Sequence, residues 1–245
     1  MKMFVFRYIG VVAALLILIP QSAYAMHIME GFLPFNWCAF WYICSIPFLI
    51  YGVMMAKRAT RDNTKLKLLL GLCGAFVFVL SAMKIPSVMG SCSHPTGVGL
   101  GAIVFGPAVM SVLGGIVLIF QALLLAHGGI STFGANVFSM AVVGPIVSYV
   151  LYTSLKKAKV PVWLSVFLAA ALGDLATYVV TAFQLALAFP SQSSGITGSF
   201  IKFLAVFAVT QVPIAIAEGI LTVLVYNYLT ANSAEELKIL SRGEA

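Results

Sequence analysis

Long apolar runs, separated by short polar stretches, follow one another along almost the whole chain. The runs cover residues 34–56, 66–83, 107–126, 135–155, 162–189 and 200–230. Each is close to or above the roughly 20 residues that an α-helix needs to cross a bilayer. The pattern therefore predicts an all-α, polytopic membrane protein, with no room for a separate soluble domain.

A shorter apolar segment, "TGVGLGAIVFG" (96–106), follows the irregular stretch "KIPSVMGSCSHPTG". It is too short for a full span, and irregular backbone at membrane depth is tolerated only where protein buries it or where it lines a cavity. We therefore expect residues 84–106 to fold into the bundle from the outer side. This segment brings the expected total to about seven helices, one of them short and Gly-rich.

Clustered basic residues set the expected orientation. Only 9% of the residues are charged, against roughly 25% in soluble domains. The net charge of +7 comes mostly from clusters between apolar runs: Lys57, Arg58, Arg61, Lys65 and Lys67, and then Lys156, Lys157 and Lys159. Such clusters indicate cytoplasmic loops, which places the mature N-terminus outside and the C-terminus in the cytoplasm. They do not form the continuous basic face that nucleic-acid binding requires.

The first 25 residues have the features of a cleavable secretory signal. Lys2 and Arg7 precede the apolar core "YIGVVAALLILI", and "AYA" ends at Ala25. This order is typical of signal peptides, with an uncleaved first helix as the alternative. Cleavage after Ala25 makes residues 26–245 the mature transmembrane domain and gives Met26 a free α-amine on the outer face.

The four cysteines, by contrast, carry no recognisable metal or disulfide pattern. They lie in or beside apolar runs without CxxC spacing: Cys38, Cys44, Cys73 and Cys92. We expect buried free thiols.

All three histidines, His27, His94 and His127, fall in segments expected on the outer side. The α-amine of Met26, the backbone nitrogen of His27 and the Nδ1 atom of His27 can close adjacent five- and six-membered rings around one ion, with all donors in a plane. His94 is the best candidate for the fourth planar position. Such an array suits Cu(II) or Ni(II), and low-spin Co(II) is also compatible. Because the amine must lose a proton, binding should weaken in acid.

Other polar residues are candidates for supporting roles. His127 follows a helix end, where histidines often bond the last carbonyls; we expect it to support the site, with direct ligation left open. Asn136 and Ser139 are candidates for orienting a ligand histidine through hydrogen bonds. Asp174 and Glu218 lie inside apolar runs, where acidic residues usually have a specific role. That role could be a hydrogen bond between helices, contact with a partner, or an ion path.

Four strings of the sequence resemble the CbiM/NikM family: "MHIMEGFLP", "GSCSHPTGVGLGAIVFGP", "QALLLAHGGISTFGANVFSMAVVGP" and "QVPIAIAEG". The resemblance implies the substrate-binding S-component of an energy-coupling factor (ECF) transporter in the cell membrane, with an S-component-like bundle and no cofactor. It also implies a coupling subunit (CbiQ), an ATPase (CbiO), a small membrane subunit (CbiN), and cobalt supply for cobalamin synthesis. Family members place the metal on residues that correspond to Met26, His27 and His94. Many of them begin directly at Met-His, whereas here a leader precedes it.

Three alternatives remain open from the sequence. The first is the same fold with nickel as the substrate. The second is a membrane metalloenzyme with a three-histidine centre, for which Glu30 is the only nearby acid. The third is a purely structural membrane protein. The sequence contains neither HExxH nor a GxxxxGK[ST] phosphate loop, so a zincin-type protease is unsupported and any ATP hydrolysis requires another chain.

Overall fold

A computed structural model of the chain describes residues 27–61, 63–86 and 92–242. The predicted signal (1–25) and Met26 lie outside these residues. The described elements are helices α2 (Phe35–Ala59), α3 (Thr64–Ala82), α4 (Val98–Phe105), α5 (Pro107–Leu124), α6 (Phe133–Asn136), α7 (Gly144–Lys157), α8 (Val162–Ala188), α9 (Gly195–Asn232) and α10 (Ala234–Arg242), the π-helical turn η2 (Val137–Val143), and strands β1 (Ile85–Pro86) and β2 (Cys92–Ser93).

Six helical segments of the described residues are long and apolar enough to span a membrane. Five of them are α2, α3, α5, α8 and α9, and the sixth is formed by α6, η2 and α7 together. With the short α4 they make the expected bundle of about seven helices. The predicted runs match their bounds closely; the largest difference is at α9, which begins at Gly195 rather than at residue 200.

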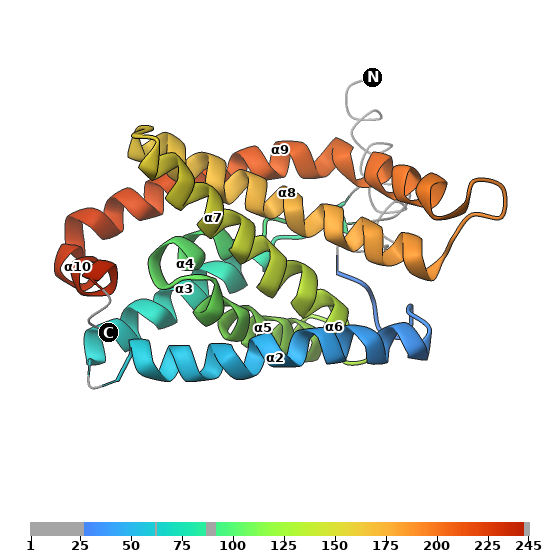
Figure 1. Cartoon of the computed structure of the whole chain (residues 1–245), viewed down its shortest axis with the longest axis horizontal. Helices are drawn as coiled ribbons and strands as arrows, with labels where there is room; N and C mark the ends of the chain where they lie inside the picture. Colours follow the sequence, from blue (N-terminus) through green and yellow to red (C-terminus); the bar gives the residue numbers. More distant parts are fainter. Residues whose placement is uncertain (1–26, 62, 87–91, 243–245) are drawn as a thin grey trace, which may run out of the picture.

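From Ser93 onward, the described part of the segment between α3 and α5 folds into the bundle, as the sequence predicts. Strands β1 and β2 pair antiparallel, and α4 follows directly. Residues Ser93 to Ala102 are all buried. In Figure 1, α4 and α7 lie between α2 on one side of the bundle and α8 and α9 on the other.

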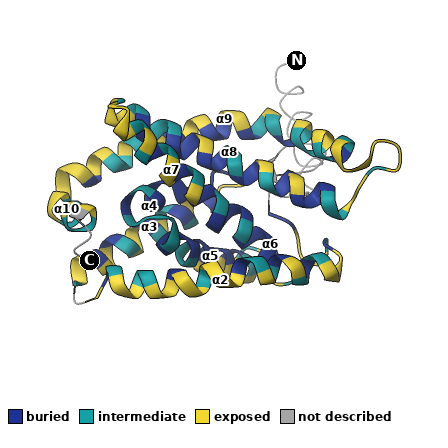
Figure 2. Ribbon diagram, viewed as in Figure 1, coloured by how far each residue is buried: buried dark blue, intermediate teal, exposed yellow. Residues whose placement is uncertain are grey.

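The outer surface is strongly apolar. Figure 2 shows exposed residues along the outward faces of α2 and α9, whereas α4 and α6 are mostly buried. Large side chains such as Ile43, Leu68 and Ile201 are 61–76% exposed. A chain that exposes so much apolar surface is stable only when lipid covers it.

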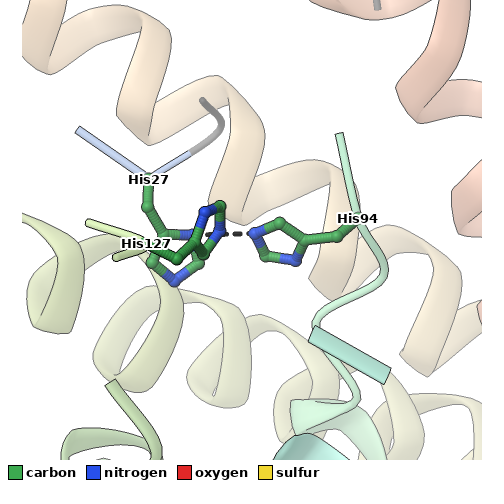
Figure 3. A group of neighbouring side chains, drawn as sticks. All are labelled: His27, His94 and His127. Carbon is green, nitrogen blue, oxygen red and sulfur yellow. Dashed lines mark hydrogen bonds between the residues drawn. The ribbon is translucent and has the colours of Figure 1, made fainter. Parts of the chain in front are cut away.

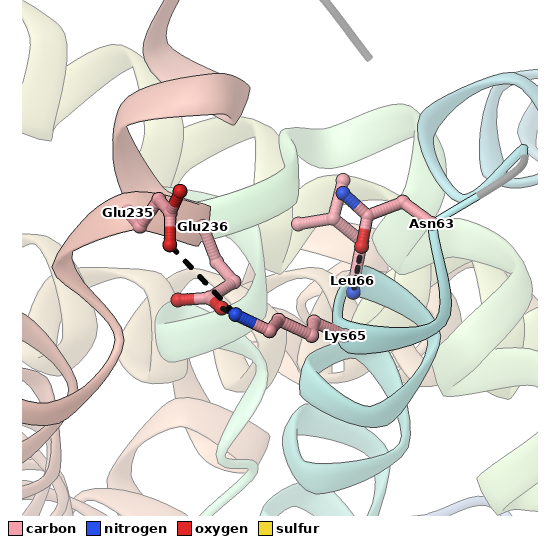
Figure 4. A network of polar contacts seen from close by, with 5 residues as sticks. All are labelled: Asn63, Lys65, Leu66, Glu235 and Glu236. Carbon is pink, nitrogen blue, oxygen red and sulfur yellow. Dashed lines mark hydrogen bonds and ion pairs between the residues drawn. The ribbon is translucent and has the colours of Figure 1, made fainter.

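Polar contacts cap the start of α3 and join it to α10 (Figure 4). Asn63 caps α3 by accepting a hydrogen bond from the backbone N–H of Leu66 at 3.1 Å. Lys65 forms ion pairs with Glu235 at 3.7 Å and with Glu236 at 3.4 Å. The residues after the last predicted run, Ala234–Arg242, form the amphipathic helix α10, which the sequence analysis did not predict.

Close approach of α2 and α6 depends on one glycine. A Cβ atom on Gly134 would lie 2.5 Å from the backbone nitrogen of Tyr42 and 2.7 Å from its Cα. The Ser45 hydroxyl also donates a hydrogen bond to the Gly134 carbonyl at 2.7 Å. Only a residue without a side chain lets these backbones meet.

Gly134→Ala is therefore expected to destabilise the protein by about 1–3 kcal/mol, because backbone atoms of α2 must move to admit the methyl group. Thermal unfolding in detergent measures the change. The matched control is Gly71→Ala in α3, where a Cβ meets nothing within 4 Å; this variant should be as stable as wild type or slightly more so. Equal melting temperatures for the two variants would contradict the packing argument.

Candidate metal centre

Three histidines from separate parts of the chain meet in one place (Figure 3). His27 precedes α2, His94 lies between β2 and α4, and His127 lies in the turn between α5 and α6. One ring nitrogen from each lies within 4.8 Å of the other two. All three side chains are buried, with 0–3% of their surface exposed. The sequence predicted that these residues share a face of the protein, and the structure brings them into contact.

His27 and His94 face each other through specific nitrogen atoms. The Nδ1 atom of His27 and the Nε2 atom of His94 are 2.8 Å apart. The other nitrogen of His94, Nδ1, lies 3.0 Å from the carbonyl oxygen of Pro95. Since that carbonyl can only accept, Nδ1 of His94 carries the proton and Nε2 presents a lone pair. His94 is thus held in the tautomer that a metal ligand needs.

His127 packs against both of the other rings. Its centroid lies 4.6 Å from that of His27 and 4.9 Å from that of His94. Its Nε2 atom is buried without a hydrogen-bond partner, as is Nε2 of His27. Buried polar atoms are nearly always paired, so the unpaired Nε2 of His127 is available to a further ligand.

The cluster favours neutral imidazoles. Burial lowers the pKa of His94 to about 4 and lowers the pKa of His27 and of His127 still more clearly. The positive charge of Lys84, whose ammonium donates to the Leu125 carbonyl at 3.0 Å, lowers all three pKa values further. Neutral imidazoles are the form that binds metal ions.

Asn136 fixes the chain beside His27. Its Oδ1 atom accepts from the backbone N–H of Ile28 at 2.8 Å, and its Nδ2 atom donates to the Ile28 carbonyl at 3.0 Å. The Thr132 hydroxyl donates to the same carbonyl at 2.6 Å. Asn136 therefore positions His27 through the backbone, not through the imidazole. Ser139 lies one step further away and donates to the Asn136 carbonyl at 3.2 Å.

Glu30 also joins the N-terminal segment to the turn that precedes α6. Its carboxylate accepts from the backbone N–H of Ser131 at 3.0 Å, and these hydrogen bonds with Ser131 lower its pKa. Its own N–H donates to the Gly128 carbonyl at 3.2 Å. The carboxylate that a metalloenzyme would use as its general base is thus directed at Ser131.

Buried polar side chains of α8 and α9 hold the loop that carries His94 through hydrogen bonds. Gln211 donates to the His94 carbonyl at 3.3 Å and to the Asp174 carboxylate at 2.6 Å. Glu218 accepts from the Thr96 hydroxyl at 3.1 Å and from its backbone N–H. The expected hydrogen bond between helices is confirmed for Asp174 on α8. The sequence did not single out Gln211 or Thr96, because nothing in their local pattern marks a partner more than 35 residues away.

Comparison with known families gives one clear match. Residues 27–236 match the CbiM family, described as "Cobalt uptake substrate-specific transmembrane region". A protein of Moorella thermoacetica named cobalt transport protein CbiM is 62% identical over 225 residues, which cover 91% of this chain and 87% of that protein. A protein of the same name from Clostridioides difficile is 61% identical and covers 94% of this chain and 92% of the relative.

Solved structures show a similar fold. A truncated transition metal transporter superposes with a TM-score of 0.73 at 27% identity, covering 84% of this chain and 98% of the other. A second crystal structure of a transition metal transporter gives a TM-score of 0.71 at 28% identity, covering 84% and 92% of the two chains.

The depressed histidine pKa values predict acid-sensitive stability in the metal-free protein. Unfolded histidines titrate near pH 6.5, whereas folded His94 stays neutral to about pH 4, so the unfolded chain binds more protons in this window. Stability is full above pH 6.5 and falls below it, with His94 contributing a loss on the order of 2 kcal/mol between pH 7 and pH 5. Melting curves in the presence of a chelator measure this loss. His94→Gln should reduce the slope, and an unchanged slope in this variant would refute the assignment.

Proposed function

The chain belongs to the CbiM family of cobalt transport membrane proteins, and on this premise we propose that it captures Co(II) in a planar nitrogen site at the histidine cluster. Its relatives are named as transport proteins, so the chain is a non-catalytic membrane component of cobalt uptake. The proposed donors are the α-amine of Met26, the backbone nitrogen and Nδ1 of His27, and Nε2 of His94.

The main support for this proposal is the distance between Nδ1 of His27 and Nε2 of His94. Two donors at right angles, each about 2.0 Å from an ion, are about 2.8 Å apart, and Nδ1 of His27 and Nε2 of His94 are separated by 2.8 Å. In the planar chelate these two atoms occupy neighbouring corners. The ion would replace the proton they share once the two rings turn so that both lone pairs point at it, and coordination by the His27 backbone nitrogen would release its amide proton.

The remaining two donors require a free N-terminus. Removal of the leader after Ala25 would turn the Met26 nitrogen from an amide into an amine next to His27. The hydrogen bonds between Asn136 and Ile28 support this arrangement, because they hold the chain immediately after His27 at 2.8 and 3.0 Å. Cleavage would thus create a ligand directly before His27, whose other neighbour, Ile28, is held by Asn136.

The charge distribution supports capture from the outside. The exposed basic residues Lys57 and Lys156 lie at the C-terminal ends of α2 and α7, whereas the histidines lie near the opposite ends of these segments. Under the positive-inside rule the histidine end faces outward. A surface hollow of about 590 Å³, lined in part by Met29, Glu30 and Gly128, lies next to His127 along the chain, and we propose that the ion approaches from it.

Uphill import needs energy from other chains, because this sequence has no phosphate loop. We propose that it works as the S-component of an ECF transporter with the coupling subunit CbiQ, the ATPase CbiO and the small subunit CbiN. The cobalt would supply cobalamin synthesis. The resemblance of the four sequence strings to the CbiM/NikM family supports these partners.

Calorimetry on the purified mature protein, with Met26 verified as the N-terminus by intact mass, tests the site. We expect one Co(II) per chain, and a loss of at least about 100-fold in affinity for His27→Ala and for His94→Ala, because each removes a donor. Binding should also weaken as the pH falls below the amine pKa of about 8. Binding that survives both substitutions would exclude the chelate.

A variant that retains the leader is the control for the N-terminal donor. Ala25→Leu should block cleavage while leaving every side chain of the cluster in place. The uncleaved protein should insert into the membrane but bind no Co(II). Full binding by this variant would show that the Met26 amine is not a ligand.

A further inference from the structure

The proposed planar site does not by itself favour cobalt. Affinities of nitrogen sites for divalent metals rise from Co(II) to Ni(II), so the four planar donors alone would select nickel. We propose that His127 is a fifth, axial donor, which Co(II) accepts and planar Ni(II) rejects, and that it shifts the preference of the site toward cobalt. This inference rests on the proposed function.

His127 belongs to the histidine cluster, but the planar chelate does not use it. In the proposed chelate the His27 imidazole contributes to the plane, and His94 meets its Nδ1 atom at the edge of the ring. The His127 and His27 rings have centroids 4.6 Å apart and planes inclined at 40°, almost the same values as for His94 and His27, and they partly overlap in Figure 3. In the proposed chelate Met26, His27 and His94 take all four planar corners, so a nitrogen of His127 could reach the ion only along the axis.

The backbone on both sides of His127 adopts an unfavourable conformation. Its neighbours Ala126 and Gly128 both have positive φ angles, 46° and 75°. For alanine this conformation is unfavourable by about 1 kcal/mol or more, and such strain gathers at functional sites. The N–H of His127 donates to the Gln121 carbonyl at 3.1 Å, which ties the turn to the end of α5.

The side chain is also available as a donor. It is 3% exposed, and its buried Nε2 atom has no hydrogen-bond partner. A ring that served only to fill space would leave this nitrogen unsatisfied at a cost of about 1–3 kcal/mol. A metal ion above the His27–His94 edge would give it a partner.

The electronic structures of the two ions explain the preference. In a strong planar field of four nitrogens, the eight d electrons of Ni(II) fill the orbital that points along the axis, so a fifth donor is repelled. Low-spin Co(II) has seven d electrons, and this orbital holds only one. It therefore binds one axial nitrogen. Geometry and electron count together can overcome the general affinity order.

The experiment compares both metals on wild type and on two variants of residue 127. His127→Phe keeps a ring against His27 and removes the donor, and His127→Ala removes both. Calorimetry should show Co(II) affinity reduced by about tenfold or more in both variants, with Ni(II) affinity changed by less than about threefold. Retained Ni(II) binding also shows that the variants are folded.

Electron paramagnetic resonance of the Co(II) protein supplies a readout that packing alone would not change. The unpaired electron of low-spin Co(II) lies in the axial orbital, so one axial ¹⁴N nucleus splits the signal into triplets. These should become doublets on labelling with ¹⁵N-histidine and disappear in His127→Phe. Absence of the splitting in wild type, or equal losses of Co(II) and Ni(II) affinity in both variants, would overturn the inference.

Failure of the underlying site would look different. His94→Ala should abolish binding of both metals whatever the role of His127. If it does not, or if wild-type Co(II) is high-spin, the planar site itself is wrong. If His94→Ala abolishes binding and Co(II) is low-spin but His127→Phe changes neither affinity ratio nor spectrum, only the axial role fails.

Discussion

The centre of this protein depends on the docking of a short N-terminal segment against the turn that leads into α6. Asn136 holds both backbone polar groups of Ile28 with hydrogen bonds of 2.8 and 3.0 Å, and two residues further along the chain the Glu30 carboxylate accepts from the backbone N–H of Ser131. An unanchored chain end would cost binding energy to order. Here hydrogen bonds to the rest of the fold hold this segment in place.

The second support comes from within the bundle. Carboxylates buried among apolar helices are costly unless they are hydrogen-bonded, and Asp174 and Glu218 both have such partners. Their hydrogen bonds end at Gln211 and at Thr96, two residues beyond His94. The long helices α8 and α9 therefore fix the loop that carries one histidine, while α6 fixes the segment that carries another.

The sequence predicted the architecture well because hydrophobic runs of membrane length have few alternative structures. It predicted that 84–106 folds into the bundle, because a short Gly-rich segment at membrane depth needs protein around it, and residues Ser93 to Ala102 are indeed buried. It also placed the three histidines on one side, although only the folded chain shows that His127 touches both others. Pairings such as Gln211 with His94 could not be inferred, since they depend on helix rotation and register. Helix α10 was missed because its apolar side is short and faces the bundle only after folding.

The hydrogen bond between His27 and His94 has a consequence for how occupancy is communicated. If an ion takes the place of the shared proton, the two imidazole rings turn toward it, while the backbone of the loaded and empty proteins can keep nearly the same shape. A partner would then have little outward displacement to detect. What loading does change is the freedom of three loops to separate, since a bridging ion holds them more firmly than one proton does. The loaded state would therefore be distinguished by reduced motion of its histidine-bearing end, and a partner would recognise it through conformational entropy rather than through shape.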